Sequence, residues 1–409
     1  MKIRPLSVAS VGVVLLALTA AMTSGAPAAL KSSTISPLLK SAASSKTLAN
    51  PGMVLLDPVT GETIFENSAD SLRKPASLLK LLSAAAILNY LEPDHRFTTE
   101  ILTGAEPNTL MIAGSLDPWM ERNNTVATKM GRVSLPKIVK TALKKLDAEN
   151  GAPIKTLRIE YASMYSVDLD FIKAQFKARN IKVSTMKVTS AEARLYANES
   201  IAKFESPTLQ TIMDWMLLWS DNTLGNRMAM YASMKAGFGY TETGIEKVYL
   251  KTLTDLEIDT KGLNAVDGSG LSKSNKVSAR MLAQLLLKTY NNDRYRTIYG
   301  GLPIGGVNGT MRSRFIKSAP EAIGLVRAKT GTLNGTVSMA GYVQGGDHEY
   351  IFVAIADQIP KGNSAAKAAR AALDKAIAKF AKPIAGASPS PSSVVENLDG
   401  TTVTSNPSS

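Results

Sequence analysis

Three short strings, far apart along the chain, most constrain how this sequence can fold. In order they are Ser77-Leu-Leu-Lys80, Ser220-Asp221-Asn222 and Lys329-Thr330-Gly331. The first offers a serine nucleophile with a lysine beside it. The second offers a hydroxyl that can handle protons and an amide, and the third offers a cation that can hold a carboxylate. Because these are the parts of one reaction, the fold is expected to bring the three strings together.

The strings differ in how specific they are. The Ser-x-x-Lys spacing is common here and also occurs at Ser71/Lys74, Ser134/Lys137, Ser184/Lys187, Ser200/Lys203 and Ser364/Lys367. By contrast, the chain contains neither a second Ser-x-Asn nor a second Lys-Thr-Gly. The order of the strings and their surroundings, more than the serine–lysine spacing, therefore favour a shared site.

Composition excludes several kinds of chemistry. The 409-residue chain has no cysteine, so thiol nucleophiles, cysteine–zinc sites and disulfides are excluded. Only His95 and His348 are present, and neither stands near a recognisable nucleophile. The usual histidine metal clusters cannot be built, so no metal and no cofactor are expected. This scarcity favours a serine enzyme whose base is a lysine.

The formal net charge of +13 favours anionic surroundings. Nucleic acid is not expected as a partner, because the basic residues are dispersed and lack a binding-module pattern. An anionic cell wall is one alternative, and a merely solvated lysine-rich surface is the other. The sequence leaves the oligomeric state open.

The two ends of the chain read as segments outside the folded core. Residues 1–28 resemble a cleavable secretory signal, with Lys2 and Arg4 before an apolar run and small residues at Ala26-Pro-Ala28. An earlier cut near Ser24 to Ala26 and an uncleaved anchor are the alternatives. Residues 384–409 are rich in Ser, Pro and Thr and are expected to be disordered. The protein is therefore expected to act outside the cytoplasm, in the cell wall or periplasm.

Hydrophobic patterns predict a sheet made from both ends of the folded part. Residues 53–56 and 63–65 read as a hairpin, and residues 325–329, 338–344 and 350–356 read as further strands joined by tight turns. Short connections favour antiparallel pairing. Residues 78–91 predict a buried helix and residues 365–380 an alanine-rich one. Ser77 could simply cap the first of these helices.

The long segment between the first two strings predicts an insert. About 140 residues separate Lys80 from Ser220, too many for a plain loop. Residues 135–146 read as an amphipathic helix, and residues 154–159 and 182–188 read as strands. Polar residues of the second string interrupt the apolar segment 209–230, which could also be a capping break between helices.

Longer motifs surround the three strings. They are Lys74-Pro-Ala-Ser77, Gly114-Ser-Leu-Asp-Pro118, Ser220-Asp-Asn-Thr-Leu-Gly-Asn226, Asp267-Gly-Ser-Gly-Leu271 and Leu302-Pro-Ile-Gly-Gly-Val-Asn-Gly-Thr-Met-Arg312. With these motifs the chain resembles the D-alanyl-D-alanine carboxypeptidases of the class C, penicillin-binding protein 4 type. The resemblance covers roughly residues 35 to 382, within the superfamily of active-serine penicillin-binding proteins and β-lactamases.

The resemblance implies an α+β (α/β) fold of the β-lactamase/DD-peptidase type. An antiparallel sheet is expected between helices, with an inserted smaller α/β domain after the nucleophile helix. The implied limits are residues 29–95 and 198–383 for the discontinuous peptidase domain and residues 96–197 for the insert. In relatives the insert is commonly longer and forms two small domains, so one of them is expected to be missing or reduced. We therefore assign no contact from the insert to the substrate.

The resemblance also implies roles in catalysis. Ser77 would attack the carbonyl between two D-alanines and form a covalent ester. Lys80 would be the base, and Ser220 would relay a proton towards the leaving amine. The backbone N–H groups of Ser77 and Thr332 would form the oxyanion hole, and water would then release the acyl group.

Substrate binding is implied for the remaining residues of the strings. Asn222 would hold the substrate amide, and Lys329, Thr330, Gly331 and Thr332 would bind the terminal carboxylate. The implied protein is a secreted serine-type D-Ala-D-Ala carboxypeptidase that trims peptidoglycan stem peptides ending in D-Ala-D-Ala. It would also bind β-lactam antibiotics covalently.

Three alternatives to a simple carboxypeptidase stay open. A DD-endopeptidase acting on cross-links would use the same residues. A β-lactamase is disfavoured, because none of the glutamates between Asn222 and Lys329 is followed four residues later by Asn, as class A deacylation would suggest. A non-catalytic β-lactam- or peptidoglycan-binding protein would tolerate loss of the site, and the intact strings argue against it.

Overall fold

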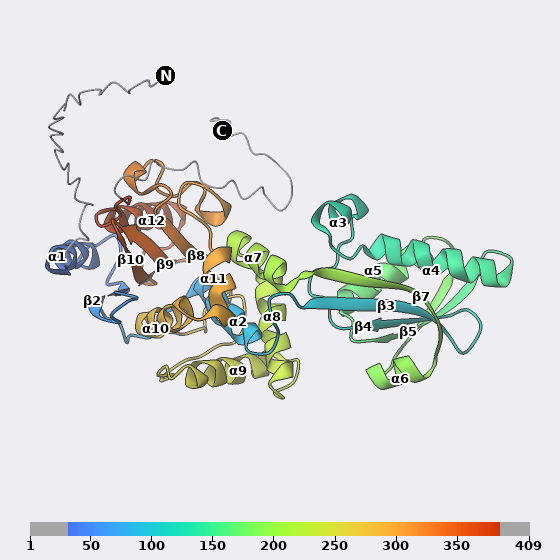
Figure 1. Cartoon of the computed structure of the whole chain (residues 1–409). Helices are drawn as coiled ribbons and strands as arrows, with labels where there is room; N and C mark the ends of the chain where they lie inside the picture. Colours follow the sequence, from blue (N-terminus) through green and yellow to red (C-terminus); the bar gives the residue numbers. More distant parts are fainter. Residues whose placement is uncertain (1–31, 385–409) are drawn as a thin grey trace, which may run out of the picture.

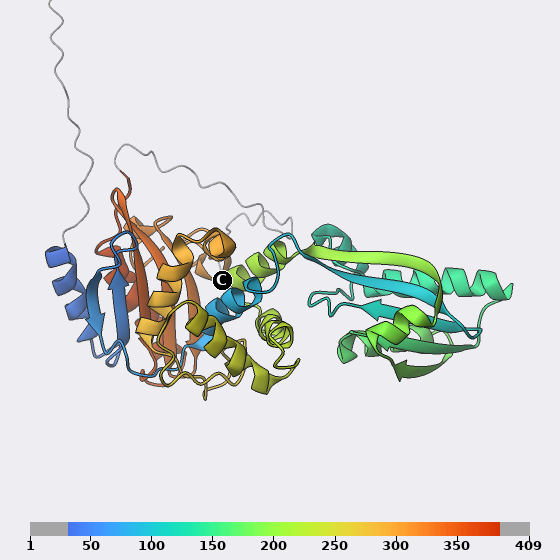
Figure 2. The same cartoon turned by 60° about the horizontal axis from the view of Figure 1, so that its bottom comes forward.

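The computed structural model describes residues 32–384, which form two lobes (Figure 1). The larger lobe contains a five-stranded sheet built from both ends of this part of the chain, and the smaller lobe contains a second five-stranded sheet. In both views the lobes lie side by side, and the chain passes between them at one end of the paired strands β3 (Arg96–Gly104) and β7 (Ala197–Thr208) (Figure 2). The predicted signal segment and nearly all of the predicted tail lie outside the described residues.

The main sheet has the strand order β2-β1-β10-β9-β8, and every neighbouring pair is antiparallel. Its strands are β1 (Gly52–Leu56), β2 (Thr63–Asn67), β8 (Val326–Leu333), β9 (Thr336–Gly345) and β10 (His348–Ala356). The predicted antiparallel sheet is therefore confirmed. Strand β8 runs past the predicted end at residue 329 and includes Thr332 and Leu333, so Asn334-Gly335 alone forms the turn to β9.

Alternating apolar side chains place this sheet between two layers of helices. In β10, Ile351, Val353 and Ile355 face one core, and Phe352 and Ala354 face the other. A strand directs successive side chains to opposite faces, so a continuous apolar run fits a strand buried on both sides. The first core packs against helices from residues 80–88 and 209–301, and the second against helices at residues 32–43 and 363–378.

The helices of the larger lobe come from segments on both sides of the insert. They are α1 (Ser32–Ala43), α2 (Lys80–Leu88), α7 (Leu209–Trp219), α8 (Asn222–Lys235), α9 (Glu242–Asp255), α10 (Ala279–Tyr290), α11 (Arg296–Gly301) and α12 (Asn363–Ala378). All nine residues of α2 are buried, as its all-round apolar sequence predicts. It is preceded by a 3-10 turn, Ala76–Leu79, so the α-helix begins two residues later than predicted.

The smaller lobe has its own core. Its sheet has the order β6-β5-β4-β3-β7, with antiparallel pairing on both sides of β3 and parallel pairing of β4, β5 and β6. The strands are β3 (Arg96–Gly104), β4 (Thr109–Gly114), β5 (Thr156–Ala162), β6 (Lys182–Lys187) and β7 (Ala197–Thr208). The helices are α3 (Asn124–Met130), α4 (Leu135–Asn150), α5 (Ser166–Lys177) and α6 (Ser190–Leu195).

Strand β7 begins where the sequence-based limit of the insert was drawn. It pairs with β3 from Ala197 to Thr208 and so completes the second sheet. Because a sheet's edge strand belongs to the unit that it pairs with, we propose Arg96–Thr208 as the inserted domain. Much of β7 is polar and exposed, which explains why hydrophobic periodicity did not locate it.

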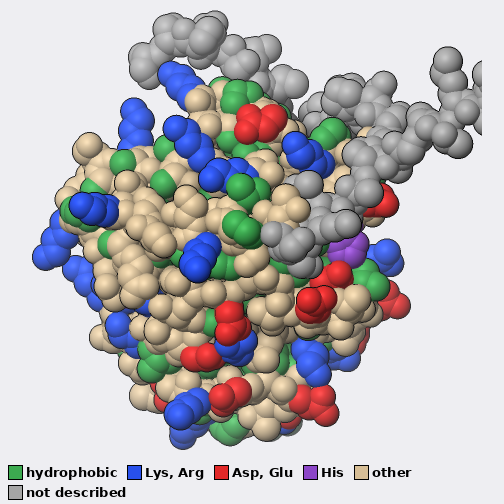
Figure 3. Space-filling view, turned by 90° about the vertical axis from the view of Figure 1, so that its left-hand side faces the viewer, with side chains coloured by type: hydrophobic (Ala, Val, Ile, Leu, Met, Phe, Trp, Pro, Cys, Tyr) green, Lys and Arg blue, Asp and Glu red, His purple; other side chains and the backbone are tan. Residues whose placement is uncertain are grey.

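Two surface properties bear on partners. On the face of the larger lobe that carries α1, basic side chains are spread singly, with acidic side chains among them (Figure 3). They do not form one continuous stripe on that face. Within residues 32–384, no helix is both long and apolar enough to cross a membrane.

Candidate active site

Ser77 lies in the 3-10 turn that leads into α2, and a neighbouring loop packs closely against this turn. Ala76, just before it, has a positive φ of 52°. The loop that carries Gly270 presses on the same turn: a Cβ on Gly270 would lie 1.9 Å from the Ala76 carbonyl oxygen. The Ser77 hydroxyl does not cap the helix, because no side chain caps the turn or α2. The capping interpretation of Ser77 is therefore wrong, and its hydroxyl is free for other contacts.

Lys80 is fully buried one turn after Ser77, and its ammonium has three acceptors. Its Nζ donates to Ser77 Oγ at 3.1 Å, to Asn222 Oδ1 at 2.8 Å and to the Ser269 carbonyl oxygen at 2.6 Å. Burial lowers the pKa of Lys80 from 10.5 to about 8, although the negative charges of Asp221 and Asp267 oppose this shift. The neutral amine that a base requires is therefore accessible near neutral pH.

The Ser269 carbonyl is positioned by the Asp267 carboxylate. Asp267 accepts hydrogen bonds from the backbone N–H groups of Ser269, Gly270 and Ser272 at 2.6–2.7 Å and from the Ser269 hydroxyl at 2.8 Å. Burial raises the pKa of Asp267, but these hydrogen bonds lower it more, so the carboxylate stays ionised. The motif Asp267-Gly-Ser-Gly was visible in the sequence, but its contact with Lys80 was not.

The second string joins two helices. Ser220 ends α7 in the left-handed region, with φ 60°, and the Asp221 side chain caps α8 by accepting from Leu224 N–H at 2.9 Å. The capping interpretation is thus correct for Asp221. The residues on either side of Asp221 belong to the site: Asn222 accepts a hydrogen bond from Lys80, and Ser220 lines the same cavity as Ser77.

The third string lies on β8, which runs beside the nucleophile turn. Lys329 is fully buried and donates to the Thr330 carbonyl oxygen at 2.9 Å. Burial, and then the positive charge of Lys80, lower the pKa of Lys329 well below its ordinary value. A carboxylate bound nearby would oppose both effects. A Cβ on Gly331 would lie 2.9 Å from the Ala76 Cβ, so glycine lets the strand approach this closely.

A cavity of about 300 Å³ brings the three strings together. Its wall contains Ser77, Ser220, Thr330 and Thr332 from the predicted set. Four further residues line it that the sequence analysis did not select as site residues: Thr310, Ser313, Arg314 and Arg370. Thr310 accepts a hydrogen bond from Thr330 Oγ1 at 2.9 Å and belongs to the long motif that ends at Arg312. Arg370 had no sequence signal.

Asn222 opens on a second, adjacent pocket. This pocket of about 430 Å³ is lined by Asn222 and Ser269 from the site and by Tyr165 from the insert. Of the three Lys80 partners, Ser77 lines the first cavity, and Asn222 and Ser269 line the second pocket.

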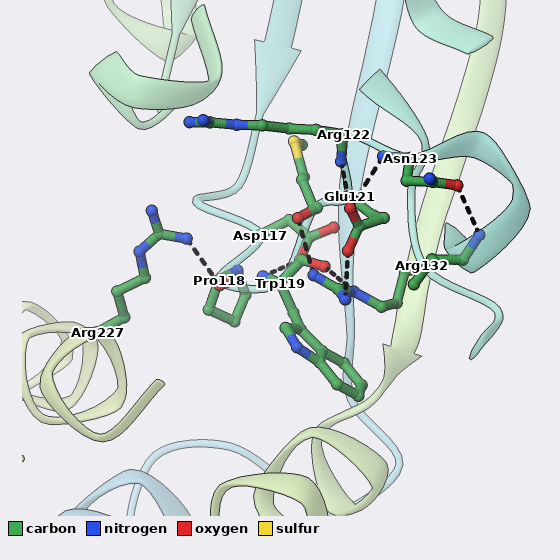
Figure 4. Close-up of polar contacts among 10 residues, drawn as sticks. Asp117, Pro118, Trp119, Glu121, Arg122, Asn123, Arg132 and Arg227 are labelled. Atoms are coloured by element: carbon green, nitrogen blue, oxygen red, sulfur yellow. Dashed lines mark hydrogen bonds and ion pairs between the residues drawn. The ribbon is translucent and has the colours of Figure 1, made fainter. Parts of the chain in front are cut away.

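The insert docks on α8, the helix that begins with Asn222. Arg227 Nη1 donates to the Pro118 carbonyl oxygen at 2.8 Å (Figure 4), and its guanidinium carbon lies 3.7 Å from the centre of the Tyr165 ring. Tyr240 of the larger lobe also donates to the Tyr165 hydroxyl at 2.9 Å. The junction thus fixes the insert against the element that supplies the second string.

Asp117 occupies a buried position in this junction. One carboxylate oxygen accepts from Trp119 N–H at 2.9 Å, and the other is buried without a hydrogen-bond partner (Figure 4). Burial raises the pKa of Asp117 to about 7, even though Arg132 and Arg227 oppose the shift.

A serine and a lysine one turn apart at a buried helix, beside an antiparallel sheet between helices, define an active-serine peptidase or β-lactamase type of fold. Solved structures agree with this class. Penicillin-binding protein 4 of Haemophilus influenzae is similar with a TM-score of 0.65 at 15% identity, over 86% of this chain and 98% of that one. A predatory endopeptidase of Bdellovibrio bacteriovorus, in complex with its immunity protein, is similar with a TM-score of 0.57 at 16% identity, over 81% and 93% of the two chains.

Family and sequence comparisons narrow the class. Residues 37–149 and 148–380 match the D-Ala-D-Ala carboxypeptidase 3 (S13) family, and the chain belongs to this family. It is 27% identical to carboxypeptidase DacB of Mycolicibacterium smegmatis, in a match that covers 72% of this chain and 75% of the relative. It is 24% identical to a D-alanyl-D-alanine carboxypeptidase of Actinomadura, in a match that covers 74% of this chain and 76% of the relative. The expected family and type of fold are therefore confirmed.

Proposed function

We propose that this protein hydrolyses the terminal D-Ala-D-Ala bond of peptidoglycan stem peptides, with Ser77 as nucleophile and Lys80 as its base. The observation that carries the proposal is the 3.1 Å contact between Lys80 Nζ and Ser77 Oγ, with Lys80 buried and its pKa lowered to about 8. In the neutral amine, the nitrogen lone pair can accept the Ser77 proton as the hydroxyl attacks.

The remaining steps follow from the lining of the cavity. Ser77 Oγ bonds to the substrate carbonyl carbon, and the backbone N–H groups of Ser77 and Thr332 stabilise the oxyanion. The proton taken by Lys80 passes through Ser220 to the leaving nitrogen, and D-alanine departs. Water then attacks the ester, returns a proton through the same groups, and frees Ser77. Asn222 holds the amide of the retained acyl part.

The leaving D-alanine carries a carboxylate, for which we propose Lys329, Thr330, Gly331 and Thr332 as the binding string. Lys329 is fully buried beside Thr330, which lines the cavity, and a carboxylate bound there would oppose the lowering of the Lys329 pKa. β-Lactam antibiotics present a carboxylate and a strained amide to the same groups, so we expect them to acylate Ser77.

The test combines labelling with product analysis. A labelled penicillin should attach to Ser77 alone, and Ser77→Ala should abolish both the label and D-alanine release from a pentapeptide while the fold survives. Attachment at Ser71 or another serine would show that the nucleophile is assigned wrongly. Cross-linked muropeptides in a parallel incubation distinguish an added endopeptidase activity by the masses of the products.

A metal-dependent mechanism would give a different result. Within residues 32–384, no three His, Cys, Asp or Glu side chains gather as a metal site. D-Alanine release should therefore be unchanged after EDTA treatment. A loss of activity that zinc restores would contradict the serine mechanism.

The proposed place of action is outside the cytoplasm, as residues 1–28 suggest. N-terminal sequencing of the protein from the cell-wall or extracellular fraction should find a start near residue 25 to 29. An anionic wall is a fitting surrounding for a chain of net charge +13.

A further inference from the structure

Arg370 reaches the catalytic cavity from α12, a helix that the sequence predicts only as packing. It is partly buried on the wall of the cavity that also contains Ser77, Thr330 and Thr332. Its Nη2 lies 3.4 Å from Thr332 Oγ1, near the limit of a hydrogen bond. The guanidinium therefore stands at the end of the cavity where the third string lies.

The nearby carboxylate does not neutralise Arg370. Asp374, one helical turn further on, accepts instead from Arg314 Nε at 2.9 Å and from Arg314 Nη2. It also accepts from Phe315 N–H at 3.2 Å and from Ser318 Oγ at 2.9 Å. Among residues 32–384, no carboxylate oxygen lies within 4.0 Å of the Arg370 guanidinium. Its positive charge is thus available to a bound anion.

The surroundings of Arg370 destabilise its positive charge when no anion is bound. Partial burial, and then the positive charge of Arg314, lower the pKa of Arg370, and Asp374 offsets this only in part. Arg314 also donates to the Arg370 backbone oxygen at 3.3 Å, which ties the helix to the cavity wall. A guanidinium that has no ion-pair partner and stands beside hydroxyl groups is suited to a carboxylate, which accepts two parallel N–H bonds from arginine.

We propose that Arg370 binds the carboxylate of the leaving D-amino acid, together with the hydroxyls of Thr330 and Thr332, and so selects substrates with a free C-terminus. This assignment rests on the proposed function. Because the carboxylate departs with the leaving group, Arg370 contributes to acylation of Ser77 and not to hydrolysis of the acyl-enzyme.

Two thioester substrates separate this role from a structural one. Both carry the same acyl-D-alanine; one has mercaptoacetate and the other has mercaptoacetamide as leaving group. The pair differs only in the carboxylate, and thioesters are reactive enough to be turned over without it. The measured quantity is kcat/KM for each substrate with wild type, Arg370→Gln, Arg370→Lys and the control Lys367→Gln, which removes an exposed cation from the same helix.

Arg370→Gln should lower kcat/KM for the mercaptoacetate thioester by about 10- to 100-fold, the usual cost of losing a charged hydrogen bond. It should change the mercaptoacetamide thioester less than about twofold. Arg370→Lys should recover part of the loss, and Lys367→Gln should leave both substrates unchanged. An equal loss on both substrates, or no loss on either, would overturn the assignment.

Failure of the proposed function itself would look different. In that case wild type would not turn over the mercaptoacetate thioester, or Ser77→Ala would still do so, and the assignment of Arg370 would fall with it. If wild type is active and Ser77→Ala is not, the ratio of the two substrates decides the role of Arg370 alone. Should Arg370→Gln unfold, the substrate ratio of Arg370→Lys decides instead.

Discussion

Lys80 and Lys329 carry the same side chain but meet different surroundings. Both are fully buried, yet Lys80 donates to three acceptors that include the nucleophile, and Lys329 donates to a backbone carbonyl. A base must be able to lose its proton, whereas a carboxylate anchor must keep one when substrate binds. Burial lowers the pKa of both lysines. For Lys80 this favours the neutral amine that a base requires, whereas for Lys329 a bound carboxylate would have to oppose the shift.

Replacing each lysine by arginine should separate the two roles. Lys80→Arg keeps the charge but removes an accessible base, so acylation by penicillin should fall by roughly 100- to 10,000-fold. Lys329→Arg keeps a cation facing the carboxylate and should be the milder change. The measurement is the second-order acylation rate with one labelled penicillin, after melting curves have shown that both variants fold. If Lys80→Arg reacts as fast as Lys329→Arg or faster, Lys80 is not the base.

The pH dependence of acylation should report the titration of Lys80. Burial lowers its pKa from 10.5 to about 8, so only about a tenth of the amine is neutral at pH 7. The acylation rate of the free enzyme should therefore rise with pH through about 8 and then level off. A rate already level by about pH 6, or still rising steeply above about pH 10, would contradict a lysine base with a pKa of about 8.

At the scale of elements, the nucleophile turn depends on how closely a loop and a strand approach it. Gly270 has φ 86°, and a Cβ there would lie 1.9 Å from the Ala76 carbonyl oxygen and 3.0 Å from Ser77 N. The contact is with backbone, which cannot rotate away as a side chain can. The loop that positions the Ser269 carbonyl therefore also fixes the turn that carries Ser77.

Gly270→Ala should displace this turn and reduce acylation by penicillin by more than about tenfold, since small misplacements of reacting groups are costly. Gly131→Ala is the matched control, because Gly131 also has a positive φ, 63°, but has no atom within 4 Å of an added Cβ. The control should lose about 1–2 kcal/mol of stability from backbone strain and keep its acylation rate. Equal acylation rates in the two variants would show that the Gly270 contact does not position Ser77.

The elements that could be predicted are those with strong local patterns. Alternating or continuous apolar runs located β1, β9 and β10, and the polar break in segment 209–230 located the end of α7 and the start of α8. Helix α9 was not assigned, although its buried residues Ile245, Val248, Tyr249, Thr252 and Leu253 repeat with helical spacing. That signal was present and was missed.

Some groups at the site could not be predicted from local sequence patterns, because only tertiary packing brings them there. Ser77, Ser220 and Thr330 could be selected because each lies in a short motif whose residue types suit one reaction. Arg370 lies in an alanine-rich helix, and only the packing of α12 beside β8 brings it to Thr332. The Ser269 carbonyl is likewise a backbone group, which no pattern of side chains indicates.

At the scale of the whole molecule, the junction between the lobes gathers all three tryptophans of the chain. Trp119 of the insert lies 5.4 Å from Trp215, and Trp215 lies 5.8 Å from Trp219, measured between ring centres. Trp119 also stacks under Arg132 at 4.6 Å. Tryptophan fluorescence therefore reports on this junction more than on either lobe.

The buried carboxylate of Asp117 should make the junction less stable as pH rises. Its pKa is raised from 3.8 to about 7 by burial, so the folded state holds a proton that the unfolded state releases above about pH 4. The stability that this proton provides is complete below about pH 4 and is lost as pH rises through about 7. The loss amounts to at most about 4 kcal/mol.

Asp117→Asn should remove this dependence, because the amide oxygen can still accept from Trp119 N–H and carries no charge. Urea unfolding followed by tryptophan fluorescence at pH 5 and pH 8 gives the free energy of unfolding of variant and wild type. The difference, variant minus wild type, should become more positive between pH 5 and pH 8. Asp170→Asn removes an exposed carboxylate from the same lobe and should show no such trend, because this carboxylate is not buried in the folded protein. If the Asp117→Asn difference is the same at both pH values, Asp117 is ionised in the folded protein and Arg132 and Arg227 outweigh its burial.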